Sequence, residues 1–337
     1  MHGGFSKFRS LARRATFAAV RALGAVSAVG VMGSAYSQEF PVRPITIVVP
    51  FAPGGPDRIA RLVAEKLQGV LKQPVVLDYK PGATGLIGAG FVQRAKPDGY
   101  TLLFTGNSGM VVAPMLRQPP PFDVAKDFAP VSMIMRYPMF LTVPPKHPAN
   151  TIAELVAMGK AKPNSINFGS PGIGSVGQLA TEIFARSAGI TMTHIPYKGI
   201  GDAQAGLMAG DIQLYLDGPL SSAELVKAGR VRPLAVTGDK RITAFPNVPS
   251  MKELGYPSVN SVVWIAIFAP KGTPDAILNK LSDEIARIVK SDEIRDQISQ
   301  GGLAEAVGST ALQLSQAIEA ESPGFAQLVK ELNLRVE

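Results

Sequence analysis

The feature that most constrains this fold is the run Ile-Thr-Ile-Val-Val at residues 45–49, which leads directly into a glycine turn and an amphipathic segment. The run does not alternate charged and apolar residues, which is typical of a parallel strand covered on both faces in an α/β sheet. Apolar residues after the turn recur at steps of three and four and predict a helix with one buried face. They are Ile59, Leu62, Val63, Leu67, Val70 and Leu71. In such sheets ligands bind beyond the carboxyl ends of the strands, where amides of the next helix favour an anion.

This strand–helix pattern occurs in two sets along the chain. The expected strands are 45–49, 75–77 and 101–104 in the first set, and 166–168, 192–195, 212–216 and 233–236 in the second. Alternating strands and helices favour parallel pairing with right-handed crossovers. Extended segments at 131–143 and 261–269 separate the sets. The sequence therefore predicts an α/β fold of two doubly wound lobes joined by two extended crossover segments. Domain 1 is expected to comprise residues 38–140 and 263–337, and domain 2 residues 141–262.

Several helix ends carry recognisable signals. Thr151 and Glu154 have the spacing of a capping box. Pro274 suits the first position of a helix, where its missing N–H is not needed. The last helix is expected to begin after Thr310 and to kink or break at Pro323 and Gly324, with Ser322 capping a short final piece.

The first 37 residues have the pattern of a secretory signal peptide. Basic residues end at Arg21, an apolar stretch runs from Ala22 to Met32, and small residues precede Gln38. We expect cleavage before Gln38, which predicts a soluble periplasmic protein. The alternative, an uncleaved membrane anchor, is disfavoured because the apolar stretch is shorter than the ~20 residues that span a bilayer.

Composition excludes several classes of function. Five of the basic residues behind the net charge of +8 lie in those 37 residues, which contain no acid, so no nucleic-acid partner is expected. Cysteine is absent, which excludes disulfides, thiolate catalysis, Cys-ligated metal and a lipid anchor. The histidines beyond the signal segment, His147 and His194, are far apart and lack a zinc-binding frame. We expect neither a metal nor a cofactor.

A glycine-rich loop after the strand at 166–168 gives a rival prediction. Gly172, Gly174 and Gly177 match the G-x-G-x-x-G fingerprint of dinucleotide-binding enzymes. That site also needs an acidic residue about 20 positions further on, to bind the ribose. The next strand instead ends at His194-Ile195-Pro196-Tyr197. An NAD(P)-dependent oxidoreductase therefore remains only an alternative.

The segment Phe51-Ala52-Pro53-Gly54-Gly55, followed by an Asp and by residues 61–67, resembles the opening of the Bug-type solute-binding proteins. These are the extracytoplasmic receptors of tripartite tricarboxylate transporters. His194-Ile195-Pro196-Tyr197-Lys198-Gly199 is a second match, and Tyr215-Leu216-Asp217 corresponds to the family's strand-end Asp that faces the cleft. The resemblance covers residues 40–337 and implies the hinged, two-lobed fold of type II periplasmic binding proteins.

This chain departs from the family pattern at two places. Only Pro56 separates the glycine pair from Asp57, whereas family members usually have two residues there. Ile173 and Gln178 stand where the family commonly has Asn and His. The residues at 173 and 178 change the hydrogen bonds offered to a ligand, so the ligand specificity is expected to differ.

The strand-end loops and the resemblance together give a set of expected ligand contacts. They are Phe51, Pro53, Gly54, Gly55, Asp57, Thr105, Asn107, Ser108, Ser170, Gly172, Gly174, Ser175, Gln178, Tyr197 and Asp217. Glycines, hydroxyls and amides dominate this set. A carboxylate held between helix N-termini of opposite lobes needs no arginine. Lys80 and Lys198 are expected to be solvated, and Trp264 to pack in the core or between the lobes.

The sequence predicts a binding protein and not an enzyme. It lacks the G-x-S-x-G nucleophile elbow and the G-x-x-x-x-G-K-[ST] phosphate loop. The resemblance implies a protein that closes on a small organic carboxylate: a di- or tricarboxylate, an acidic amino acid or an aromatic acid. A monomer is the default expectation. Its partners would be the integral membrane subunits of a transporter. Besides the oxidoreductase, an alternative is a protein that presents its ligand to a membrane sensor.

Overall fold

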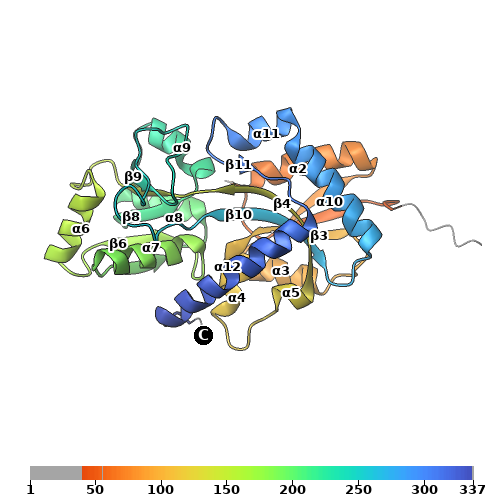
Figure 1. Ribbon diagram of the computed structural model, residues 1–337, viewed down its shortest axis with the longest axis horizontal. Helices are drawn as coiled ribbons and strands as arrows, with labels where there is room; N and C mark the ends of the chain where they lie inside the picture. The colour runs from red at the N-terminus through yellow and green to blue at the C-terminus, as the bar shows by residue number, and fades with distance from the viewer. Residues whose placement is uncertain (1–39, 55, 336–337) are drawn as a thin grey trace, which may run out of the picture. The chain divides into compact units, whose positions relative to one another are not determined.

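The computed structural model describes residues 40–54 and 56–335, and these contain two β-sheets (Figure 1). The first sheet has six strands in the order β11-β4-β10-β3-β1-β2. Their bounds are β1 (Ile45–Val49), β2 (Val75–Tyr79), β3 (Thr101–Gly106), β4 (Phe128–Tyr137), β10 (Val263–Pro270) and β11 (Glu305–Ala306). The expected parallel pairing is confirmed for β1 with β2 and β3. Strand β10, which was expected only as a crossing segment, is antiparallel to both β3 and β4.

The second sheet has five strands in the order β7-β6-β8-β5-β9. Their bounds are β5 (Phe140–Val143), β6 (Asn167–Ser170), β7 (Thr193–Pro196), β8 (Leu214–Asp217) and β9 (Arg232–Val236). Strand β6 is parallel to β7 and β8, whereas β5 is antiparallel to β8 and β9. Both sheets are therefore mixed, because in each of them one strand that enters from the other lobe runs against its neighbours.

Helices cover both sheets. The first lobe has α2 (Asp57–Leu71), α3 (Leu86–Gln93), α4 (Ala113–Met115), α5 (Val124–Asp127), α10 (Asp275–Lys290), α11 (Asp292–Ser299) and α12 (Ala311–Glu331), with the short turns η1 (Ala83–Gly85) and η2 (Ser108–Val112). The second lobe has α6 (Ile152–Ala161), α7 (Val176–Ala188), α8 (Ile200–Ala209) and α9 (Pro219–Lys227). The predicted apolar face of α2 is confirmed, because Ile59, Val63 and Leu67 are each at most 1% exposed.

The chain crosses between the sheets in two neighbouring places. The segment expected to be extended at 131–143 is two strands, β4 in the first sheet and β5 in the second, separated by Pro138 and Met139. The chain returns through β10, whose first residue Val263 pairs with Tyr137, the last residue of β4. Figure 1 shows β4 and β10 running between the lobes. Trp264 on β10 is 4% exposed, as expected for a core residue.

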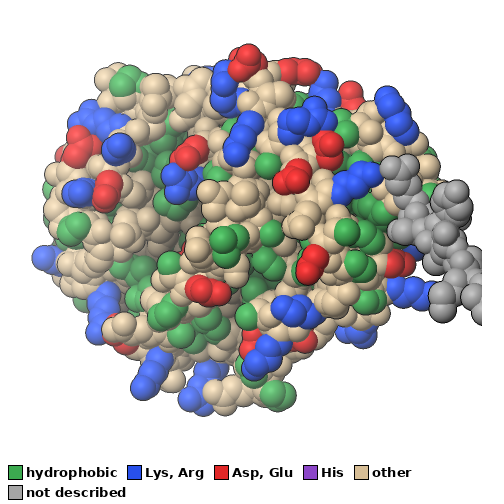
Figure 2. Space-filling model, turned by 45° about the vertical axis from the view of Figure 1, so that its right-hand side comes forward, with side chains coloured by type: hydrophobic (Ala, Val, Ile, Leu, Met, Phe, Trp, Pro, Cys, Tyr) green, Lys and Arg blue, Asp and Glu red, His purple; other side chains and the backbone are tan. Residues whose placement is uncertain are grey.

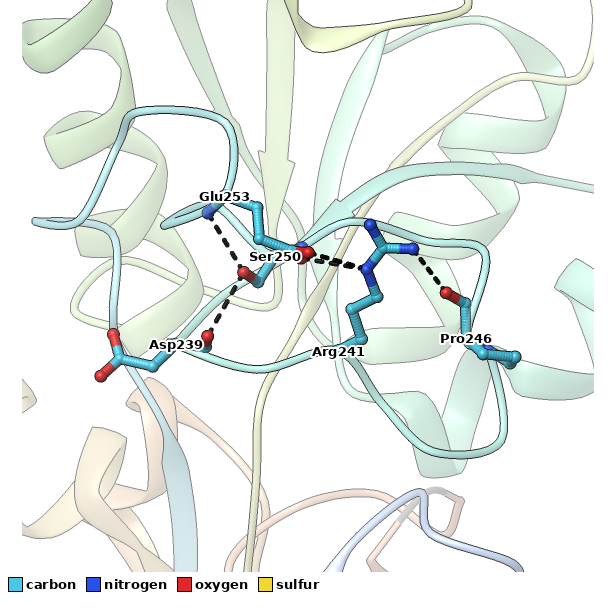
Figure 3. A network of polar contacts seen from close by, with 5 residues as sticks. All are labelled: Asp239, Arg241, Pro246, Ser250 and Glu253. Atoms are coloured by element: carbon cyan, nitrogen blue, oxygen red, sulfur yellow. Dashed lines mark hydrogen bonds and ion pairs between the residues drawn. The ribbon is translucent and has the colours of Figure 1, made fainter.

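A polar network holds the long segment between β9 and β10 (Figure 3). The Arg241 guanidinium bonds the Glu253 carboxylate, with Nε to Oε1 at 3.0 Å, and Nη1 donates to the Pro246 carbonyl at 2.7 Å. Ser250 and Glu253 exchange main-chain to side-chain bonds, and the Ser250 hydroxyl donates to the Asp239 carbonyl. Accepting the Ser250 amide lowers the pKa of Glu253, so the carboxylate stays ionised in this network. The segment is thereby ordered without a regular strand or helix before β10.

Three predicted helix ends can be compared with the structure. Thr151 caps α6 by accepting from the Glu154 amide, while the Glu154 side chain accepts from Asn150 N. Pro274 is the residue before α10 and has extended ψ, so its assignment to the first helical position is wrong. The expected break at Pro323 is also wrong: α12 is one helix of 21 residues, and the Ser322 hydroxyl donates to the Ile318 carbonyl within it.

Figure 2 shows how the charged side chains are distributed on one face of the molecule. There, lysines and arginines are interspersed with acidic side chains instead of forming a basic patch. In residues 40–54 and 56–335, no helix has both the length and the apolarity needed to cross a bilayer. The predicted signal peptide, residues 1–37, lies outside the described residues. The predicted domain boundaries remain a proposal.

Candidate functional site

A cavity of about 310 Å³ lies where the two lobes face each other. It is lined by Gly54, Asp57, Arg58, Ile59, Leu220 and Gln300. The first four belong to the turn after β1 and the start of α2, and Leu220 is the second residue of α9 in the other lobe. The cavity is therefore bordered by the N-terminal turns of two helices from opposite lobes. Its volume is at the lower end of the range for small-molecule sites.

The start of α2 is arranged around Asp57. This carboxylate is 5% exposed and is held inside the first lobe. Its Oδ2 accepts from Arg61 Nε at 3.0 Å and Nη2 at 2.8 Å, and Oδ1 accepts from the Tyr79 hydroxyl. Pro56, in the position before the helix, offers no side-chain cap. Gly54 has φ of 129°, which a residue with a side chain rarely adopts, and Gly55 lies outside the described residues.

The loop that follows β6 contacts the first lobe at a different part of the interface. Thr84 Oγ1 donates to the Ile173 carbonyl at 2.7 Å, and the Val176 amide donates to Ser108 Oγ at 3.1 Å. A Cβ on Gly174 would lie 2.7 Å from Leu116 Cδ1 and one on Gly172 would lie 2.8 Å from Thr84 Oγ1. These glycines therefore allow close packing of the lobes. They do not line the cavity.

Side chains inside the second lobe fix the shape of that loop. The Ser170 hydroxyl lies 2.7 Å from His194 Nε2. Burial lowers the pKa of His194 to about 4, so the ring is neutral at pH 7. Ser175 caps α7 by accepting from Gln178 N at 3.3 Å, and Gln178 Oε1 accepts from Gly174 N at 2.9 Å. Ser170, Ser175 and Gln178 therefore hold the loop and are each at most 2% exposed.

The predicted residues after β3 lie at the junction of the lobes. Thr105 is buried on β3, and Asn107 Nδ2 donates to the Val262 carbonyl at 3.0 Å, just before β10. Asn107 is fully buried, and its Oδ1 has no partner among the described residues. Asn107 therefore connects the end of β3 to the returning crossing.

The remaining predicted residues are dispersed. Asp217 is 3% exposed, and its two oxygens accept from Gln204 Nε2 at 2.6 Å and Ser221 Oγ at 2.7 Å. Burial raises the pKa of Asp217 to about 6. Tyr197 packs at Gly206 of α8, where an added Cβ would lie 2.2 Å from its hydroxyl oxygen. Phe51 packs edge-on against Phe104, with ring centroids 6.2 Å apart. Pro53 is exposed.

Of the predicted residues that the structure describes, only Gly54 and Asp57 line the cavity, and sequence reasoning missed Arg58, Ile59, Leu220 and Gln300. Arg58 and Ile59 directly follow Asp57, and Leu220 follows β8, so the strand-end rule could have found all three. Gln300 lies at the end of α11, where no sequence pattern marks it. Among the described residues, no group of three or more His, Asp or Glu side chains could hold a metal ion.

Comparison with known proteins identifies the family. Residues 59–334 match the family described as "Tripartite tricarboxylate transporter family receptor". The chain is 34% identical over 314 residues to protein BugT of Bordetella pertussis, covering 93% of this chain and 96% of that protein. A solved structure of an R. palustris protein with adipate has 32% identity and a TM-score of 0.83, covering 88% of this chain and 99% of that chain. MatC from Rhodopseudomonas palustris, with bound malate, has 28% identity and a TM-score of 0.80, covering 86% and 100%.

Proposed function

Because the chain belongs to the family of tripartite tricarboxylate transporter receptors, we propose that it binds a small organic carboxylate between its lobes and delivers it to the integral membrane subunits of a transporter. The family comprises binding receptors and not enzymes, and the oxidoreductase alternative receives no support. The observation that carries the proposal is the cavity bordered by the starts of α2 and α9. Similar proteins solved with adipate and malate support the class of ligand.

The physical basis of binding is the positive end of the helix dipole at the two N-termini, since the Asp57 and Ile59 amides already donate to the Gly54 and Pro56 carbonyls and Pro219 has no N–H. The helix dipole favours a negative charge there. A carboxylate in the cavity would lie at the start of α2 in one lobe and the start of α9 in the other. Because such a ligand contacts both lobes, it binds the closed state more tightly and shifts the population towards it.

The other predicted contacts take part indirectly in this proposal. Thr105, Asn107 and Ser108 support the junction of the lobes, and Ser170, Gly172, Gly174, Ser175 and Gln178 form a loop that packs across it. Phe51, Pro53 and Gly55 flank Gly54, while Tyr197 and Asp217 support the second lobe. The bonds from Thr84 to Ile173 and from Val176 to Ser108 form only where the lobes meet. We propose that they stabilise the closed state.

Calorimetry on residues 38–337 tests the function directly. The panel contains monocarboxylates, dicarboxylates such as malate and adipate, tricarboxylates, acidic amino acids and aromatic acids, with NAD as the comparison. We expect at least one carboxylate to bind with one site per chain and NAD to show no binding. Binding of NAD, with no carboxylate bound, would overturn the proposal.

Location and partners form the finer part of the proposal. We expect the full-length chain to be exported to the periplasm and its N-terminus to be Gln38 after cleavage, which fractionation and N-terminal mass spectrometry measure. A pull-down with ligand-loaded protein is expected to recover transporter subunits from membranes. Recovery of a sensor kinase instead would favour the ligand-presenting alternative.

A further inference from the structure

The residues that line the cavity include a cation, Arg58, although a carboxylate held between helix N-termini is expected to need no arginine. Of the six lining residues, only Arg58 carries a positive charge. Asp57 carries a negative charge, but its oxygens already accept from Arg61 and Tyr79. Leu220 contributes an apolar surface from the opposite lobe. The residues that line the cavity therefore combine two helix N-termini, an apolar side chain and an arginine.

The Arg58 guanidinium is held in place by neutral groups. Nη1 donates to Gln297 Oε1 and Nη2 donates to the Gln297 carbonyl, both at 2.7 Å. Within residues 40–54 and 56–335, Arg58 forms no ion pair, whereas Arg61 pairs with Asp57 and Lys66 pairs with Glu293. A fixed guanidinium without an acidic partner retains the ability to pair with an anion.

Helix stability does not account for a cation at this position. Arg58 is the second residue of α2, in the first turn, where the helix dipole favours acidic side chains and disfavours basic ones. Its contact with α11 also does not require a charge, because Gln297 offers only neutral acceptors. A ligand that brings a negative charge to Arg58 would explain why an arginine stands here.

We propose that Arg58 recognises a second carboxylate of the ligand and so makes the protein select dicarboxylate anions over monocarboxylates. This inference rests on the proposed function. One carboxylate binds at the helix N-termini, the intervening carbons lie against Leu220, and the far carboxylate accepts from the guanidinium. Gln300 borders the same cavity and its amide can donate to that group as well. A ligand whose far end is uncharged would offer no carboxylate to Arg58, and the charge-assisted hydrogen bond would be lost.

The test compares each dicarboxylate with its own half-ester. Calorimetry on residues 38–337 uses succinate, glutarate and adipate and their monomethyl esters, which differ by one negative charge at nearly equal length. For the best-bound pair, we expect the diacid to bind about 10- to 100-fold more tightly than the half-ester, as for one hydrogen bond to a charged group. Arg58→Gln is expected to remove that preference by weakening the diacid and leaving the half-ester within about 2-fold. Arg58→Lys keeps the positive charge but loses the planar guanidinium that can donate two parallel hydrogen bonds. We expect it to give an intermediate preference for the diacid.

Lys66→Gln is the matched control. It removes the same charge from the same helix and also breaks a contact between α2 and α11, but Lys66 does not line the cavity. We expect it to keep the full preference. Equal binding of diacid and half-ester by the unmodified protein, or an unchanged preference in Arg58→Gln, would overturn the role of Arg58 alone. Failure of every carboxylate to bind would instead overturn the proposed function, and this inference with it.

Discussion

At the scale of single residues, the surroundings of Glu321, which does not line the cavity, change the pH range over which its carboxyl group ionises. The Trp264 indole Nε1 donates to Glu321 Oε1 at 2.6 Å. Burial raises the pKa of Glu321 to about 7, although hydrogen bonds from Trp264 and Asn107 act in the opposite direction. Glu321 thus contacts both β10 and the end of β3, where the lobes join.

This raised pKa predicts a pH dependence of stability. A carboxyl group with a raised pKa in the folded state stabilises the protein below its unfolded pKa of 4.5, and this stabilisation is lost as pH rises through about 7. The side chain in Glu321→Gln cannot ionise. The change in the free energy of unfolding between pH 5 and pH 8 should therefore be smaller in this variant, by about 1–3 kcal/mol. Urea denaturation at the two pH values measures this.

Fluorescence gives a second, local measurement of the same group. Trp264 is the only tryptophan in the chain, so its emission is expected to change with a midpoint near pH 7 as its hydrogen-bond partner ionises. Glu321→Gln should abolish that transition. Asp217, whose pKa is about 6, ionises in a neighbouring pH range. It is present in both the unmodified protein and Glu321→Gln, so it serves as the internal reference. An unchanged midpoint in the variant would assign the transition to another group.

At the scale of elements, α12 continues through two residues that usually interrupt helices. Pro323 and Gly324 lie inside the helix, and its later part reaches the second lobe, where Arg186 Nη1 on α7 pairs with Glu331 at 2.7 Å. A Cβ on Gly324 would meet no atom within 4 Å. Gly324→Ala is therefore expected to stabilise the protein by about 0.5–1 kcal/mol, because glycine loses more chain entropy in a helix. Chemical denaturation measures this, and a destabilised variant would show that the helix is broken at this point.

The elements were predicted well where local sequence decides them. The apolar run of β1 and the three- and four-residue steps of α2 were sufficient, because burial on one or both faces leaves a periodic pattern. The direction of β10 was not predictable in this way, since its pairing with β3 and β4 joins residues more than 100 positions apart. The helix at Pro323 was mispredicted because contacts of α12 with both lobes outweigh a local preference against proline.

The candidate site was less predictable than the fold. Local glycine patterns identified Gly54 and Gly174 equally, but only Gly54 borders the cavity, while Gly174 packs on Leu116. Which loops face each other depends on how the lobes dock, and no local pattern records that. Gln300 lines the cavity from a helix end that lies 243 residues after Asp57, in a part of the chain without a motif.

At the scale of the whole molecule, ligand affinity depends on how readily the lobes close. Thr84→Ala removes the bond from Thr84 Oγ1 to the Ile173 carbonyl, while Thr84→Ser keeps a hydroxyl and serves as the control. Losing one hydrogen bond of the closed state is expected to weaken binding of the best carboxylate by about 3- to 10-fold. Calorimetry measures the affinity. Equal affinities for the alanine and serine variants would show that this bond does not influence closure.

The neighbouring positions of β4 and β10 have a consequence for how the lobes move. Tyr137 and Val263 are paired, so the outgoing and returning chain leave the first sheet at the same point of its hydrogen-bonded ladder. Two connecting strands that are hydrogen-bonded to each other cannot bend independently. They define one rotation axis, which passes near the Tyr137–Val263 pair. Relative motion of the lobes thus reduces to a single angular coordinate, for which relaxation after rapid mixing with ligand should have one conformational phase.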